Sequence, residues 1–177
     1  AQHPSEELER VLRYGLLASR TVAVMSVGDA TRTVGYSPDG SLALAAGDTG
    51  EARLFETASG RPRRVLRHGA PILSAVFAPG DGVVATAGRD GVTRLWDVQT
   101  GARLQELRQD GAVWVTAFSP DGRLLATGGA GQRVRVWDAA TGALVREHDH
   151  AMAIRSAEFS PDGSLLMTVA RDAQVFD

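Results

Sequence analysis

Hydrophobic and polar positions along the chain follow one pattern that returns every 41 residues. In each unit an aromatic residue stands just before a turn rich in proline and glycine, and a second aromatic residue closes the unit. The closing residues repeat with the same spacing, except that the last step is 39. A period of this length is typical of repeat architectures, in which each unit buries its apolar face against its neighbours. The turn aromatics are Tyr36, Phe77, Phe118 and Phe159, and the closing aromatics are Phe55, Trp96, Trp137 and Phe176.

Each unit is predicted to form four short antiparallel strands. The Ser-Pro-Asp-Gly turns at 37–40, 119–122 and 160–163 favour hairpins. Proline presets φ there, aspartate bonds its own backbone, and glycine tolerates positive φ. The third segment of a unit alternates apolar and polar residues, and the more charged fourth segment suits an exposed edge. The predicted second strands are 42–46, 83–87, 124–128 and 165–169, and the clearest third strands are 92–96 and 134–137.

The dipeptides Trp96-Asp97 and Trp137-Asp138 end two of the third strands, in register with the turns. In these features the chain resembles the WD-repeat β-propeller family, whose unit is four strands. The resemblance covers residues 21–177 and implies an all-β fold, a propeller with four blades in this chain. The implied blades are 28–67, 68–108, 109–149 and 150–177, with 21–27 as a closing outer strand of the last blade.

Residues 1–20 differ from the repeats. Ser5 followed by two acidic residues is a helix-start signal, and Leu8, Val11 and Leu12 share one helical face. The pattern predicts a short N-terminal helical segment. Since WD-type blades usually form rings of more than four, we expect part or half of a larger ring. Two interpretations stay open: a piece of a longer ring, or two chains that pair into eight blades.

The resemblance also implies a hydrogen-bond network inside each blade. It joins a histidine before the first strand, a Ser or Thr on the second, an aspartate in the next turn and the tryptophan. This interpretation makes the histidine and aspartate structural, not a catalytic pair. In the third unit Gly131 replaces the aspartate, and in the fourth Phe176 replaces the tryptophan. Only the second unit has all four members, His68, Thr86, Asp90 and Trp96.

Propellers of this family usually bind partners on the face with the loops before the first strand and between the second and third strands, here called the loop face. Trp114 and Arg155 share a first-strand position that Arg32 and Leu73 occupy in the other units. A tryptophan at a position that tolerates arginine is expected on the surface; the alternative is packing against a neighbouring blade or the N-terminal helix. Trp and Arg are enriched among binding hot spots. The partner-binding candidates are Asp48, Arg89, Asp110, Trp114, Met152, Arg155 and Arg171.

Composition narrows the function classes. The net charge of −2 provides no field for recruiting nucleic acid or an acidic membrane. The chain has no cysteine, which excludes disulfides and thiolate chemistry and fits a cytoplasmic protein. All 19 basic residues are arginine, and the absence of lysine and asparagine indicates a bacterium with a GC-rich genome. Without lysine there is no P-loop or Schiff-base chemistry.

Other chemical motifs have simpler explanations. The two histidines of 148–150 lack a third metal ligand, and the glycine-rich 128–131 connects two strands, so no helix N-terminus faces a phosphate. No serine sits in a Gly-x-Ser-x-Gly elbow. The arginines of 61–67 are interpreted as a solvated edge, with an acidic partner as the alternative. We therefore expect no catalytic, cofactor-binding or metal-binding residues.

The interpretation is a non-catalytic protein–protein interaction scaffold or sensor module, belonging to a larger bacterial signalling or regulatory protein. Its partner is expected to be a protein or peptide on the loop face. The alternative is a self-assembling half-propeller whose homodimerisation completes the ring.

Overall fold

The structure is a computed structural model that describes residues 30–80 and 82–177. These residues form β-strands and no helix, so the all-β prediction is confirmed. The helix predicted in residues 1–20 and the strand predicted at 21–27 lie outside the described residues. The strands are β1 (Thr31–Tyr36), β2 (Leu42–Gly47), β3 (Glu51–Glu56), β4 (Pro62–Arg67), β5 (Ile72–Phe77), β6 (Val83–Gly88), β7 (Val92–Asp97), β8 (Arg103–Arg108), β9 (Val113–Phe118), β10 (Leu124–Gly129), β11 (Arg133–Asp138), β12 (Leu144–Asp149), β13 (Ser156–Phe159), β14 (Leu166–Val169) and β15 (Ala173–Phe176).

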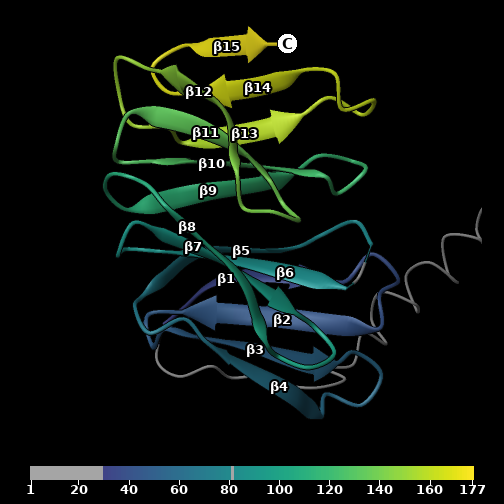
Figure 1. Cartoon of the computed structure of the whole chain (residues 1–177). Coiled ribbons are helices and arrows are strands. Elements are labelled where there is room, and N and C mark those ends of the chain that lie inside the picture. The colour runs from purple at the N-terminus through teal and green to yellow at the C-terminus, as the bar shows by residue number, and fades with distance from the viewer. Residues whose placement is uncertain (1–29, 81) are drawn as a thin grey trace, which may run out of the picture.

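The strands form four antiparallel sheets in chain order. Sheet 1 is β1-β2-β3-β4, sheet 2 is β5-β6-β7-β8, sheet 3 is β9-β10-β11-β12, and sheet 4 is β13-β14-β15. Sheet 4 therefore has three strands in the described part of the chain, where the other sheets have four. The sheets stack in an open row, with sheet 1 at the bottom of Figure 1 and sheet 4, beside the C-terminus, at the top.

The Ser-Pro-Asp-Gly sequences form the hairpin turns that were expected from them. In the turn of sheet 3, Ser119 Oγ donates to Asp121 Oδ1 at 2.6 Å, and the amide of Leu124 donates to Ser119 Oγ at 2.9 Å. Gly122 closes the turn at φ +72°, a conformation that side-chain-bearing residues rarely adopt. The hydrogen bond from Ser119 holds the pKa of Asp121 below its usual value. This chemistry sets where each first strand ends and the second begins.

The core lies between the sheets. One cluster joins Leu44 and Leu54 of sheet 1 to Val84 and Trp96 of sheet 2, and a second joins Leu95 and its neighbours to sheet 3. A third cluster links sheets 3 and 4. Sheets 2 and 3 each bury one face against the sheet before and the other against the sheet after, whereas sheets 1 and 4 each pack against one sheet within the described residues. The apolar positions that form these interfaces therefore return every 41 residues.

A polar contact between successive sheets also repeats every 41 residues. Arg64 donates to the main-chain oxygen of Thr100 at 2.9 Å, Gln105 donates to that of Ala140 at 2.7 Å, and Arg146 donates to that of Asp177 at 2.5 Å. Each donor lies on an outer strand; Arg64 and Gln105 reach a turn of the next sheet, and Arg146 reaches the residue that follows β15. The predicted arginine strip on β4 is therefore partly used inside the molecule, since Arg64 joins sheet 1 to sheet 2.

Candidate partner-binding face

The innermost strands of sheets 1, 2 and 3 lie side by side and expose one repeat position each at the loop face. Thr33 Oγ1 donates to the main-chain oxygen of Ala75 at 3.3 Å, and the hydroxyls of Ser74 and Thr116 lie 2.8 Å apart. These contacts fix β1, β5 and β9 relative to one another. Arg32 and Leu73 lie next to these contacts along their strands, and Trp114 lies two residues before Thr116; the three share one repeat position and form a row.

This row lines a hollow of about 580 Å³, here called the Trp114 hollow. Arg89 reaches it from the β6–β7 turn, and Ala112 from the residues before β9. Trp114 is 39% exposed, so its indole forms part of an accessible wall. The hollow thus combines two guanidinium groups with an aromatic and an aliphatic surface, contributed by three sheets. Its lining is Arg32, Leu73, Arg89, Ala112 and Trp114.

The two arginines of the Trp114 hollow differ in their partners. Arg32 binds the carboxylate of Asp48 with two nitrogens, and its Nη2 lies 2.8 Å from Oδ2. This hydrogen bonding, assisted by the positive charge of Arg89, holds the pKa of Asp48 below its usual value. Within residues 30–80 and 82–177, Arg89 enters no ion pair or side-chain hydrogen bond, so its guanidinium is available to an anionic group.

The four network residues of sheet 2 form a chain of directed hydrogen bonds. Trp96 Nε1 donates to Thr86 Oγ1 at 2.8 Å, so the threonine hydroxyl donates onward to His68 Nδ1 at 2.8 Å. His68 Nε2 is then the protonated nitrogen, and it donates to Asp90 Oδ1 at 3.2 Å. Asp90 also accepts from Arg94 at 3.0 Å. The geometry fixes the tautomer of His68 and satisfies each buried polar group.

Burial is the largest single influence on the pKa of His68 and of Asp90, but it sets the direction of the shift only at His68. It lowers the pKa of His68, although the hydrogen bond to Asp90 opposes the shift. Burial alone would raise the pKa of Asp90, but hydrogen bonds from Arg94 and His68 outweigh it, and the pKa lies below its usual value. A neutral histidine whose two nitrogens are already engaged has a structural role.

In sheets 3 and 4 the network is shorter. Trp137 Nε1 donates to Thr127 Oγ1 at 2.8 Å, and Thr127 donates to the side-chain oxygen of Gln109, which stands in the position of His68. In sheet 4, Thr168 Oγ1 lies 3.1 Å from Nε2 of His150. The Nδ1 atom of His150 is buried and has no hydrogen-bond partner among residues 30–80 and 82–177.

The family model described as "WD domain, G-beta repeat" matches the chain three times, at residues 60–97, 101–138 and 142–176. These matches cover more than half of the chain. The chain belongs to the WD-repeat family. A search of the curated proteins finds no match. WD repeats generally mediate protein–protein interaction and are usually non-catalytic, so the family supports a scaffold role.

The WD-repeat register explains how the predicted partner-binding residues are distributed. Arg89 and Trp114 meet at the Trp114 hollow, and Asp48 adjoins it through Arg32. Asp110 instead pairs with Arg135 at 3.3 Å. The remaining three candidates are exposed on the fourth blade and are not among the residues that line the Trp114 hollow; they are Met152, Arg155 and Arg171.

Arg32, Leu73 and Ala112 line the Trp114 hollow but were not among the sequence candidates. The repeat position shared by Arg32, Leu73 and Trp114 was the available signal, because any residue at that position reaches the same side of its blade. Nothing in the sequence marks Ala112 as a lining residue, because its place in the Trp114 hollow depends on how closely the second and third blades pack.

Among residues 30–80 and 82–177, no group of three or more His, Cys, Asp or Glu side chains is arranged to hold a metal ion. In the same residues no helix has the length and apolarity that crossing a membrane requires.

Proposed function

We propose that this chain is a protein-interaction module that holds a peptide segment of a partner protein at the Trp114 hollow. The observation that carries the proposal is the convergence on one accessible concavity of Trp114 and of Arg89, which has no ion-pair partner among the described residues. Trp and Arg are among the residue types most enriched among binding hot spots. The family's general role in protein–protein interaction supports the same conclusion.

The chemistry of the Trp114 hollow favours a particular kind of peptide. Arg89 would bind a carboxylate, since a guanidinium and a carboxylate form paired, charge-assisted hydrogen bonds. Trp114 and Leu73 would cover a neighbouring apolar side chain. The partner segment is therefore proposed to place an acidic residue next to a hydrophobic one. The net charge of −2 supports a protein partner over nucleic acid or an acidic membrane.

The biological setting belongs to the same proposal. The module spans residues 21–177, residues 1–20 form a separate segment, and the whole serves as a sensor or scaffold in a larger bacterial signalling or regulatory protein. The exclusive use of arginine as the basic residue supports a bacterium with a GC-rich genome, and the absence of cysteine supports the cytoplasm.

Selection of binders from a displayed library of random peptides tests the proposed function. We expect enriched sequences to pair an acidic residue with an apolar one. Trp114→Ala should weaken binding of a selected peptide about tenfold or more, and Arg89→Ala should weaken it and reduce its salt dependence. The matched control is Arg123→Ala, an exposed arginine on the opposite edge of the sheets. The proposal would be contradicted if no peptide were enriched, or if the Trp114 and Arg89 variants bound a selected peptide as tightly as the wild type does.

A second candidate function is self-assembly, in which two copies complete one ring. Apolar pairs at the two ends of the row favour it. Met167 and Val175 of sheet 4 are 43% and 59% exposed, and Val34 and Tyr36 of sheet 1 are 72% and 67% exposed. Exposed apolar surface of this kind marks interaction sites.

A further inference from the structure

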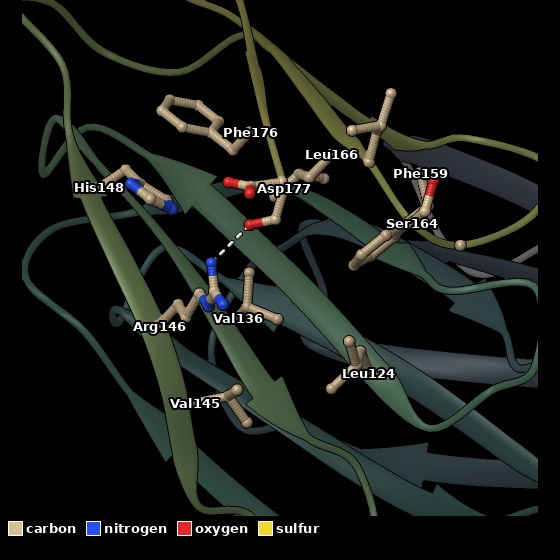
Figure 2. Close-up of a pocket in the computed structure, with 12 residues that line it drawn as sticks. Leu124, Val136, Val145, Arg146, His148, Phe159, Ser164, Leu166, Phe176 and Asp177 are labelled. Carbon is tan, nitrogen blue, oxygen red and sulfur yellow. Dashed lines mark hydrogen bonds between the residues drawn. The ribbon is translucent and has the colours of Figure 1, made fainter.

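Sheets 3 and 4 leave a hollow of about 250 Å³ between them, here called the Phe176 hollow. Figure 2 shows Phe176 and His148 on one side of it and Leu124 and Phe159 on the other. The rings of His148 and Phe176 stack at 4.0 Å between centroids. His148 occupies the repeat position of Leu66 and Leu107, which are buried between the other sheets.

The other three sheets show what normally lies along this edge. In each of them the third strand pairs with an outer fourth strand in one constant register. Leu54 pairs with Arg64 in sheet 1, Leu95 with Gln105 in sheet 2, and Val136 with Arg146 in sheet 3. The equivalent residue of sheet 4 is Val175 on β15, and in the described part of the chain β15 pairs with β14 alone. The free edge of β15 is therefore a site for one more antiparallel strand.

On the two end sheets, the repeat positions that are buried between the inner sheets are exposed. Met167 pairs with Val175 across β14 and β15, as Leu44 pairs with Leu54 and Ala85 with Leu95. The inner members of this set are at most 1% exposed, because each is covered by the leading face of the next sheet. The leading face of sheet 2 does this with Ala75 and Phe77, and the same positions in sheet 1 are the exposed Val34 and Tyr36. The two end faces thus have the chemistry of the interior interfaces.

The chain contains a segment whose sequence suits the empty strand position. Residues 21–27 lie one repeat before β4, and they lie outside the described residues. The constant register of the other sheets places Ala23 opposite Val175 and Met25 opposite Ala173. Met25 then takes the repeat position of Leu66 and Leu107, whose side chains are buried between sheets.

The open row prevents this segment from reaching β15 of its own chain. Only residues 28–30 separate residue 27 from the start of β1, so the link spans at most about 14 Å. Sheets 1 and 4 lie at opposite ends of the row (Figure 1), and three sheet spacings amount to about 30 Å. A second copy removes the difficulty, because its sheet 1 would lie directly against sheet 4 of the first copy.

We infer that two copies of this chain exchange the strand at residues 21–27, each completing sheet 4 of the other. This rests on the second candidate function, self-assembly. In the pair, Val34 and Tyr36 of one copy cover Met167 and Val175 of its partner copy. The exchanged strand pairs with β15 and closes the Phe176 hollow. A two-fold arrangement repeats both contacts and gives a closed ring of eight four-stranded sheets, within the range that propellers adopt.

Disulfide trapping tests the exchange. The chain has no native cysteine, so any disulfide must form between the introduced cysteines. Ala23→Cys and Val175→Cys are made separately, one with a mass label, and the purified copies are mixed and oxidised. Opposed residues of an antiparallel pair lie within the distance that a disulfide spans. We expect a covalent pair that contains one copy of each variant. Light scattering of the wild type should give twice the 18.7 kDa of one chain.

Val175→Glu should weaken the pairing about tenfold or more, because it puts a charge into the covered face. Leu104→Glu is the matched control, since Leu104 is 47% exposed and lies on β8 of sheet 2, which is not an end sheet. A dimer that gives no mixed disulfide would overturn the exchange and leave self-assembly standing. A monomeric mass would overturn both. An internal disulfide in the double variant Ala23→Cys/Val175→Cys would show that the strand stays within its own chain.

Discussion

At the scale of single residues, the WD repeats are held by a few buried polar groups that have no substitute partners. Asp90 is the acceptor for His68 and also binds Arg94. Removing one partner from such a chain leaves a buried donor unsatisfied, which costs more than the hydrogen bond itself gained. The same position in sheet 4 is Asp172, while the Nδ1 atom of His150 has no partner in the described part of the chain. The repeats therefore provide their own control.

Asp90→Ala is expected to lower the free energy of unfolding by about 1–3 kcal/mol, because His68 Nε2 loses its acceptor in a buried site. Asp172→Ala should change it by less than about 0.5 kcal/mol. Urea denaturation of both variants measures the difference. Wild-type stability in the Asp90 variant would refute the structural role of the network.

The lowered pKa of His68 predicts how stability depends on pH. In the unfolded chain the imidazole titrates near its usual pKa of 6.5, whereas in the fold burial holds it neutral to lower pH. Its contribution is therefore complete above pH 6.5 and declines as the pH falls from 6.5 through the folded pKa. His68→Gln copies the natural Gln109 of sheet 3 and should flatten this decline in thermal unfolding. An unchanged pH profile in that variant would contradict the assignment; the buried His150, whose pKa burial also lowers, contributes the remainder.

At the scale of elements, much of the strand order could be predicted because every local signal repeats. The Ser-Pro-Asp-Gly turn occurs in three units and the Trp-Asp end in two, all in one register, and β2, β6 and β10 begin where the sequence places them. β14 begins at Leu166, one residue later than predicted, and Leu165 is exposed. These features depend on residues close together in sequence, and for that reason they could be predicted from the sequence.

The Trp114 hollow was less predictable because it depends on packing between sheets. Its lining comes from three sheets, and two of its members, Leu73 and Ala112, are unremarkable by residue type. The 41-residue period also does not predict that Arg32 pairs with Asp48. That ion pair occupies Arg32 and leaves Arg89 to bind an anionic group. The sequence located the repeat position and the face, while the set of residues that meet there followed from the stacking of the sheets.

Gly131 shows how element packing overrides a family pattern. A Cβ at this position would lie 2.0 Å from the main-chain oxygen of Asp110, and backbone cannot move aside cheaply. Gly131→Asp restores the network residue of the family, yet we expect it to lower the free energy of unfolding by about 1–3 kcal/mol. Gly35→Ala is the control, because its Cβ would meet nothing within 4 Å. A stabilised Gly131 variant in chemical denaturation would show that the turn can relax.

At the scale of the whole molecule, the described sheets form an open row with two kinds of unused surface. One is polar and concave, with the indole of Trp114 beside the guanidinium of Arg89. The other consists of apolar end faces that match the interior interfaces. The two surfaces are compatible, because pairing through the ends leaves the loop face open. A peptide-binding module that doubles its sites by pairing would also gain affinity through multivalency.

The central claim is that a partner peptide binds at the loop face. Amide hydrogen exchange, measured with and without a selected peptide, tests where that peptide lies. The account predicts slower exchange at residues 30–33, 88–91 and 112–114, which surround the Trp114 hollow, and no change at the turns 37–40 and 119–122 on the opposite edge. Protection of those turns, with the Trp114 hollow unaffected, would contradict it.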